Sequence, residues 1–184
     1  MTHTHLSATP LVQATPRRRF LRLATLGAGA ALFAVAGLRS AHAASDKPLD
    51  ALLLSCMDYR LMDDVERYMD GRGLADKYDH VILAGASLGA ITDVYPTWQQ
   101  TFWDHVDIAI QLHNIQRVIL LDHRDCGAYK VLLGDAHLAS PDIEKATHAE
   151  QLAILKQRIN AKHPKLAVET LLMALDGSVE VLEV

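Results

Sequence analysis

The sequence contains no apolar run as long as the roughly 20 residues that a membrane-spanning helix needs. Its N-terminal apolar stretch, residues 23–38, is short and rich in glycine and alanine. Arginines 17–19 precede this stretch and the small-x-small tripeptide Ala41-His42-Ala43 follows it, an arrangement typical of a secretory signal. A Phe-Leu pair after the arginines indicates the twin-arginine export route. We therefore expect a signal peptide over residues 1–43 and a periplasmic mature protein with no stable membrane anchor. A single uncleaved anchor is the alternative.

Basic residues are scarce after this segment. The five arginines before residue 44 leave 13 of the 18 basic residues against 22 acidic ones, a formal net charge of −9 for residues 44–184. Nucleic acids and anionic membrane surfaces require basic patches, so we expect neither as a partner. Residues 44–184 contain no internal repeat and have the length of one compact domain. We expect a single domain there.

Cysteine is also rare, because the chain has only Cys56 and Cys126. In an exported bacterial protein, two cysteines most often form one disulfide. Twin-arginine export carries folded proteins, however, so a metal could reach the thiols before they meet an oxidising compartment. Composition alone leaves the disulfide and the metal site both open.

The pattern of apolar residues predicts an α/β fold. Three near-continuous apolar runs end abruptly in polar residues, as strands buried on both faces do, over residues 49–56, 80–86 and 117–123. Apolar residues at helical spacing predict helices over residues 61–73, 97–113 and 143–163. An Asp-Gly dipeptide at 176–177 predicts a hairpin between a fourth strand and a C-terminal edge strand. We expect a mostly parallel central sheet of about four strands, an antiparallel C-terminal edge strand, and helices on both faces.

Two polar clusters follow strand ends in this scheme. Cys56, Asp58 and Arg60 alternate directly after the first strand, and His123 and Cys126 stand three apart at the end of the third. Ligands bind beyond the carboxyl ends of parallel strands. If these strands are neighbours, two thiolates and one imidazole come together. These are donors that zinc prefers, and three protein ligands leave a fourth position open.

These two segments, Cys56-Met57-Asp58-Tyr59-Arg60 and His123-Arg124-Asp125-Cys126-Gly127, resemble the β-class carbonic anhydrases, and the order of elements is similar over nearly all of residues 49–184. The resemblance implies that Cys56, His123 and Cys126 are Zn²⁺ ligands and that Asp58 and Arg60 form the catalytic dyad. It also implies a homodimer or higher homo-oligomer.

The activity implied is the reversible hydration of carbon dioxide to bicarbonate by a zinc-bound hydroxide. Zinc lowers the pKa of a bound water from near 16 toward roughly 7. Asp58 would accept a hydrogen bond from that water. Arg60 would hold Asp58 through paired hydrogen bonds and keep it away from the metal.

The sequence departs from the family pattern at two places near this site. The segment Ile82-Leu83-Ala84-Gly85 lacks the Arg-Asn pair that is common in the family after the second strand, and Asp122 replaces the usual glycine before the histidine ligand. These changes leave the substrate open. A related heterocumulene such as carbonyl sulfide or carbon disulfide is the alternative substrate. A non-catalytic zinc-binding protein, including one with Asp58 bound to the metal, is the alternative function.

The remaining polar residues of this region carry weaker signals. Ser87 borders the same crevice and could offer a hydrogen bond, and Tyr129 is expected in the core. Six histidines lack any partner spacing and are expected at the surface or in helix caps, with two of them, His105 and His113, as candidates for the core: His80, His105, His113, His137, His148 and His163.

Overall fold

The computed structural model describes residues 49–184. The signal peptide expected over residues 1–43 lies outside the described residues. None of the helices within residues 49–184 is both long and apolar enough to cross a membrane.

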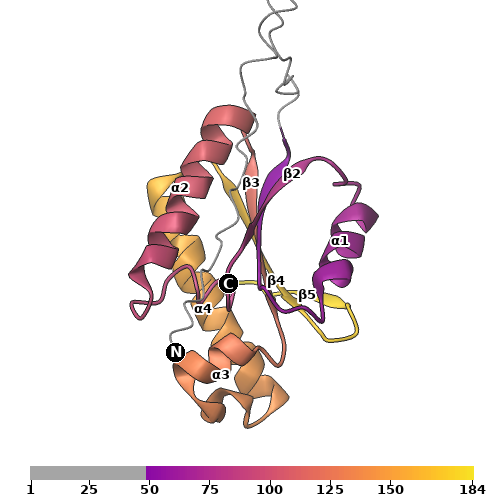
Figure 1. Cartoon of the computed structure of the whole chain (residues 1–184), viewed down its shortest axis with the longest axis vertical. Helices are drawn as coiled ribbons and strands as arrows, with labels where there is room; N and C mark the ends of the chain where they lie inside the picture. Colours follow the sequence, from indigo (N-terminus) through magenta and orange to yellow (C-terminus); the bar gives the residue numbers. More distant parts are fainter. Residues whose placement is uncertain (1–48) are drawn as a thin grey trace, which may run out of the picture. The chain divides into compact units, whose positions relative to one another are not determined.

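The described chain forms one five-stranded sheet with the strand order β2-β1-β3-β4-β5 (Figure 1). Four strands run parallel and the last is antiparallel to its neighbour. The strands are β1 (Ala51–Ser55), β2 (Tyr78–Ile82), β3 (Arg117–His123), β4 (Ala167–Met173) and β5 (Val179–Val181). This sheet confirms the predicted fold class.

Helices cover both faces of the sheet, as predicted (Figure 1). On one face, α2 (Pro96–His113) and α4 (Pro141–Lys162) pack against alternate strand residues such as Leu54 and Leu120. On the other face, α1 (Met62–Gly71) packs against the intervening residues, including Leu53 and Ile119. This alternation follows from the two-residue period of a strand. Two short helices, α3 (Gly127–Leu133) and η1 (Asp135–Leu138), follow β3.

The second strand differs from its prediction. Residues 80–86 read as a buried strand, but β2 ends at Ile82 and lies at the edge of the sheet, where only Val81 of its residues is buried. Gly85 and Ala86 have positive φ angles of 77° and 40°, which an extended strand does not accommodate. The apolar residues after β2 therefore form a compact loop, residues 83–92, that packs into the core.

The C-terminal hairpin forms where the Asp-Gly dipeptide predicts it. The amide of Ala174 donates to the carbonyl of Ser178 at 2.8 Å, and Met173 pairs with Val179. Gly177 has a positive φ of 81°, which glycine adopts without strain. The hairpin places β5 beside β4 and brings Glu180 toward the end of β3.

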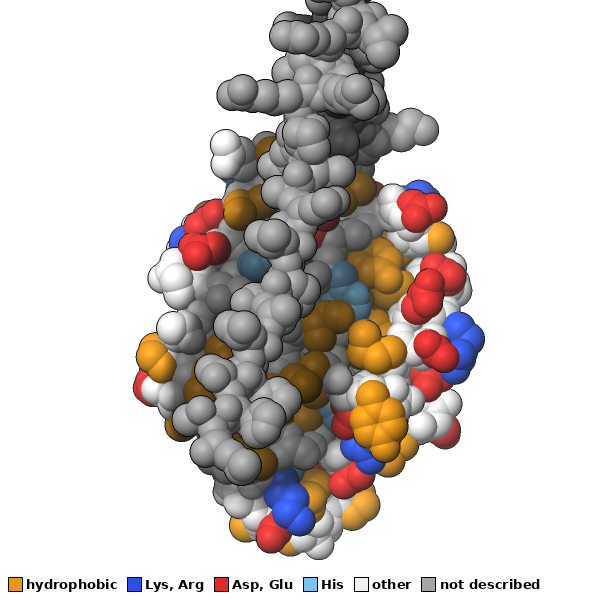
Figure 2. All heavy atoms as spheres, in the orientation of Figure 1, with side chains coloured by type: hydrophobic (Ala, Val, Ile, Leu, Met, Phe, Trp, Pro, Cys, Tyr) orange, Lys and Arg blue, Asp and Glu red, His pale blue; other side chains and the backbone are white. Residues whose placement is uncertain are grey.

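Charged side chains of both signs mix along the right-hand edge of the face in Figure 2, with hydrophobic side chains exposed inward of that edge. Among the described residues on this face, the basic side chains stand apart from one another and form no continuous patch.

Candidate metal centre

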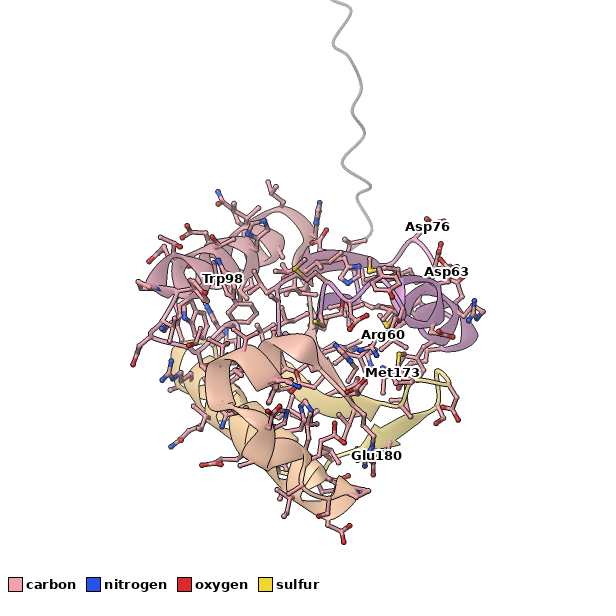
Figure 3. All side chains as sticks on the ribbon, turned by 60° about the horizontal axis from the view of Figure 1, so that its bottom comes forward. Arg60, Asp63, Asp76, Trp98, Met173 and Glu180 are labelled. Carbon is pink, nitrogen blue, oxygen red and sulfur yellow. The ribbon has the colours of Figure 1, made fainter. Side chains whose placement is uncertain are left out.

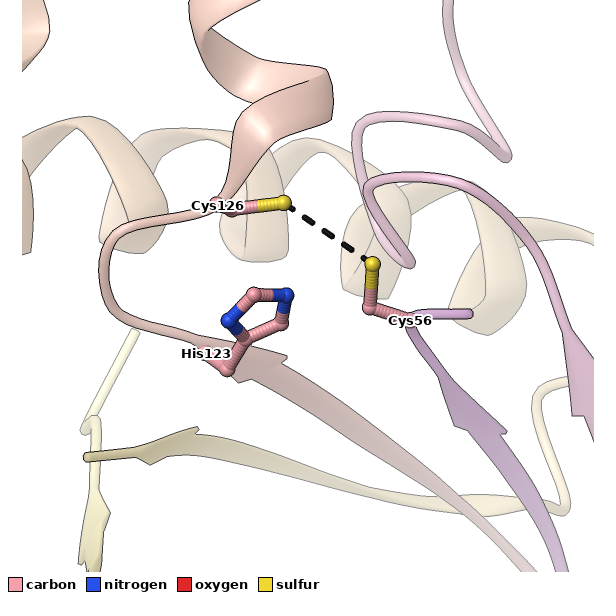
Figure 4. Close-up of side chains that lie close together, drawn as sticks. All are labelled: Cys56, His123 and Cys126. Carbon is pink, nitrogen blue, oxygen red and sulfur yellow. Dashed lines mark hydrogen bonds between the residues drawn. The ribbon is translucent and has the colours of Figure 1, made fainter. Parts of the chain in front are cut away.

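The two polar clusters meet because β1 and β3 are parallel neighbours. Leu54 pairs with Leu120 and Ser55 with Leu121, so both strands end at the same edge of the sheet. Cys56 follows β1 directly, and His123 is the last residue of β3. Cys126 precedes the first turn of α3 as its N-cap. The structure thus brings together the three residues for which the sequence predicts metal binding (Figure 4).

The geometry of this cluster fits a tetrahedral zinc ion. One ligand atom from each of Cys56, His123 and Cys126 lies within 4.8 Å of the others, and all three residues are buried. The Cys56 and Cys126 sulfurs are 3.8 Å apart, and both cysteines are free. A disulfide requires about 2.05 Å, whereas two sulfurs on one tetrahedral zinc, each at about 2.3 Å, lie roughly 3.8 Å apart. The sulfur separation in this structure is therefore too long for a disulfide and is compatible with two sulfurs bound to one metal ion.

His123 is oriented for metal binding by its backbone partner. Its Nδ1 lies 2.9 Å from the carbonyl oxygen of Arg124, which can only accept, so Nδ1 carries the proton. Nε2 is buried without a hydrogen-bond partner among the described residues. Burial lowers the pKa of His123, but the nearby Cys56 thiolate, together with the Arg124 carbonyl and Asp58, outweighs burial and raises the pKa overall. In the neutral ring, with its proton on Nδ1, Nε2 has the free lone pair that a metal ligand requires.

The Cys56 and Cys126 thiols lie within hydrogen-bond distance of each other. The hydrogen bond from Cys126 lowers the pKa of Cys56 to about 4, assisted by His123 and by the Gly85 amide 3.3 Å from Sγ, while burial opposes the shift. The same hydrogen bond, together with burial, raises the pKa of Cys126. The site therefore stabilises one thiolate even without a cation, and the thiolate is the form that binds metals.

Asp58 is held by Arg60 at the edge of the cluster. Its Oδ1 accepts hydrogen bonds from the Arg60 backbone amide at 3.0 Å and from Nε at 2.9 Å, and its Oδ2 accepts from Nη2 at 2.8 Å. These bonds, chiefly those from the side chain, lower the pKa of Asp58 to about 2. Asp58 Oδ2 lies 3.8 Å from His123 Nε2. The carboxylate thus stays ionised beside the cluster while both of its oxygens remain bound to Arg60.

Asp125 provides a second anchor for Arg60. The Asp125 side chain accepts from Arg60 Nη1 at 2.8 Å, and its backbone carbonyl accepts from Nη2 at 2.9 Å. Asp125 has a positive φ of 55°, a conformation that aspartate tolerates better than most residues. Its amide donates to the buried Glu144 of α4 at 2.5 Å. The turn that carries two of the candidate ligands therefore also fixes the guanidinium that holds Asp58.

A pocket with a volume of 630 Å³ opens beside Cys56, Asp58 and Arg60. Figure 3 turns this end of the molecule forward and labels Arg60 and Trp98, two of the residues that line the pocket. Apart from Asp58, Arg60 and Asp125, the lining side chains are mostly apolar or aromatic: Met57, Tyr59, Ala84, Tyr95, Trp98, Ala128, Val131 and Leu132. Small uncharged molecules can approach the cluster along this wall.

Two polar residues near the site, Asp122 and His148, are buried in a way that the sequence did not predict. His148 was expected at the surface or in a cap, but it is fully buried and lies 2.9 Å from the Asp122 carboxylate. Helical spacing could have revealed this, because His148 shares a buried face with Glu144, Leu152 and Leu155. Asp122, which the sequence marked only as a departure, is buried as well.

Comparisons with known proteins agree with this geometry. A family model described as "putative carbonic anhydrase" matches residues 48–183. An uncharacterized protein from Rickettsia conorii (strain ATCC VR-613 / Malish 7) is 46% identical over 129 residues, which cover 70% of this chain and 69% of the relative. An uncharacterized protein from Rickettsia bellii (strain RML369-C) is 43% identical over 129 residues, which cover 70% of this chain and 79% of the relative.

Among solved structures, the β-carbonic anhydrase CafA of the fungal pathogen Aspergillus fumigatus matches with a TM-score of 0.51 at 15% identity, over 74% of this chain and 76% of that chain. At this identity the likeness concerns the fold. Together with the family model, which spans nearly all the described residues, it shows that the chain belongs to the carbonic anhydrase family as a divergent member with the β-class fold.

Proposed function

We propose that the chain is a zinc-dependent carbonic anhydrase that hydrates carbon dioxide reversibly to bicarbonate. One observation carries the proposal: the ligand atoms of Cys56, His123 and Cys126 converge within 4.8 Å, beside an Asp58 carboxylate that Arg60 holds through three hydrogen bonds. Membership of the carbonic anhydrase family supports it.

Cys56, His123 and Cys126 would hold the zinc ion. The sulfur separation, the free Nε2 of His123 and the donor set of two thiolates and one imidazole all fit zinc. When bound, zinc supplies Lewis acidity, which brings the pKa of a coordinated water toward neutrality. Three protein ligands would leave one position for that water, and the pocket opens beside Cys56.

Asp58 would orient the attacking water and remain off the metal. As an ionised carboxylate it can only accept hydrogen bonds, so a water near the cluster donates to it and directs a lone pair toward the substrate. Arg60 restrains both Asp58 oxygens and is itself restrained by Asp125. Carbon dioxide, a small neutral molecule, suits the apolar wall formed by residues such as Trp98 and Val131.

The first prediction concerns zinc binding. Purified protein is expected to contain one zinc per chain, measured by plasma emission spectroscopy. The variant His123→Gln is expected to lose it, because a missing ligand weakens binding by more than the 10–100-fold typical of residues that only support a ligand. His105→Gln is the matched control, since His105 is exposed and bonds only to the Thr101 carbonyl. Full zinc occupancy in His123→Gln would contradict the assignment.

The second prediction concerns catalysis. Stopped-flow measurements on the zinc-loaded protein are expected to show carbon dioxide hydration. Asp58→Asn is expected to lower kcat/KM by about 10²–10⁴-fold, the range for loss of a positioned acid or base, with zinc content unchanged. Asp63→Asn, an exposed carboxylate in the first turn of α1, should leave the rate as it was.

Other results would redirect the assignment. Zinc-loaded protein that turns over carbonyl sulfide or carbon disulfide, but not carbon dioxide, would identify the alternative substrate class. Zinc-loaded protein inactive on all three would be a non-catalytic zinc-binding member of the family.

We also propose that the protein acts as a homodimer or higher homo-oligomer. Large apolar side chains stand exposed around the pocket, with Met57, Tyr59 and Val131 exposed to 63%, 87% and 77%. Light scattering is expected to give at least twice the mass of the chain. Val131→Glu should shift the protein toward the monomer, whereas Val184→Glu at the C-terminus should not. A monomer with full hydration activity would contradict the proposal.

The arginines at 17–19 and the tripeptide Ala41-His42-Ala43 support a further proposal, export to the periplasm through the twin-arginine route. Cell fractionation is expected to recover the protein in the periplasm with an N-terminus at Ala44. The double variant Arg17→Lys/Arg18→Lys should stay in the cytoplasm. The control Arg39→Lys should still be exported, and periplasmic recovery of the double variant would argue against this route.

A further inference from the structure

A buried carboxylate with four donors lies next to the metal centre. Asp122 is only 1% exposed, and its Oδ1 accepts a hydrogen bond from the Ser87 amide at 3.0 Å. Its Oδ2 lies 2.6 Å from Ser87 Oγ and 2.9 Å from His148 Nδ1, and it also accepts from the Tyr129 hydroxyl. Ser87, Tyr129 and His148 are fully buried. We call these four residues the Asp122 network.

Every partner in this network can donate, which satisfies an ionised carboxylate. The Ser87 amide is a fixed donor, the two hydroxyls can each turn a proton toward Oδ2, and a proton on His148 Nδ1 completes the set. An unpaired buried carboxylate would be strongly destabilising. Because all of its partners are donors, Asp122 can lie buried beside Tyr129 of α3 and His148 of α4.

The network joins the segments that carry the three metal ligands. Asp122 precedes His123 on β3, and strand alternation turns the two side chains in opposite directions. Ser87 belongs to the 83–92 loop, whose Gly85 amide donates to Cys56 Sγ at 3.3 Å. Tyr129 lies in the first turn of α3, which begins after Cys126. One carboxylate therefore contacts the strand, the loop and the helix that place His123, Cys56 and Cys126.

The 83–92 loop is tightly packed, which restricts the conformations that it can adopt. A Cβ added at Gly89 would lie 2.4 Å from the carbonyl oxygen of Ala84, and one at Gly85 would lie 3.2 Å from the Ala128 Cβ. The loop thus folds tightly on itself and against the start of α3. Of the hydrogen bonds in the described chain, those of Ser87 are the ones that tie this loop to the end of β3.

A purely apolar cluster would stabilise this core at least as well, because buried polar groups rarely add net stability over well-packed hydrocarbon. Directional hydrogen bonds, by contrast, fix the distance and angle between the segments that they join. A metal site needs such fixed distances, since its ligands must be held within about 0.5 Å.

We propose that Asp122 is a positioning residue of the metal centre: through Ser87, Tyr129 and His148 it holds the segments carrying Cys56, His123 and Cys126 at the separation that the metal requires. This inference rests on the metal site of the proposed function and is independent of the substrate.

The test measures metal affinity and coordination in place of activity. Zinc affinity is obtained by competition with a chromophoric chelator, and coordination from the visible spectrum of the Co²⁺-loaded protein. Asp122→Asn is expected to weaken zinc binding by about 10–100-fold and to change the positions and intensities of the cobalt bands. Ser87→Ala and Tyr129→Phe, which each remove one hydroxyl, should produce the same changes to a smaller degree.

Thr170→Val is the matched control. Thr170 is buried and its hydroxyl donates to the Leu182 carbonyl, away from the metal centre. Its loss should lower the melting temperature while leaving zinc affinity and the cobalt spectrum as in the unmodified protein. The double variant Ser87→Ala/Asp122→Asn should bind zinc no more weakly than Asp122→Asn, because both changes act through one carboxylate.

The outcomes separate this proposal from the proposed function. If Ser87→Ala, Tyr129→Phe and Asp122→Asn lower only the melting temperature, as Thr170→Val does, the network is structural and the proposal is wrong. If Asp122→Asn does not fold, the two hydroxyl variants decide the question. Unmodified protein that binds neither zinc nor cobalt would overturn both proposals, whereas metal binding without carbon dioxide hydration would overturn only the proposed function.

Discussion

The parallel pairing of β1 with β3 is the constraint on which the site depends. It places two strand ends at one edge, so that a cysteine after one strand meets a histidine and a cysteine after the other. No local structure could do this, because Cys56 and Cys126 are 70 positions apart. The apolar side chains of both strands, buried on both faces of the sheet, supply the stability that keeps the donor atoms together without a cation.

Around this pairing, charged side chains hold the turn between His123 and Cys126 from both sides. Asp125 binds Arg60 on the side of the pocket, and Glu144 binds the Asp125 amide from α4. Arg124 extends the support by bonding Glu144 and, at 2.7 Å, Glu180 of β5. The Arg60–Asp125 pair is exposed. The contacts of Glu144 and Arg124 are partly buried, where fixed geometry contributes more than at an exposed surface. The turn is therefore held rigidly although it belongs to no regular element.

Much of the fold could be predicted from the sequence, because apolar runs and helical periodicity indicate which faces of the strands and helices are buried. The strands β1 and β3 and the helix α2 were located within a few residues, and the three candidate ligands lie together as expected. The edge position of β2 could not be predicted, since an apolar run does not reveal how many neighbours a strand has. The seven residues of α3 were too few to show a helical period.

The contacts of Asp125 with Arg60 and of Asp122 with His148 join elements that are distant in sequence, so only the folded chain reveals them. The N-terminal prediction concerns residues that the structure does not describe.

Residues that support the candidate ligands lie later in the chain than the ligands themselves, so they are synthesised after them. The candidate ligands end at Cys126, but the residues that support them continue to His148 in α4 and to Glu180 in β5. A ribosome delivers these segments last. The candidate metal site can therefore reach its geometry in this structure only after Glu180 has been synthesised.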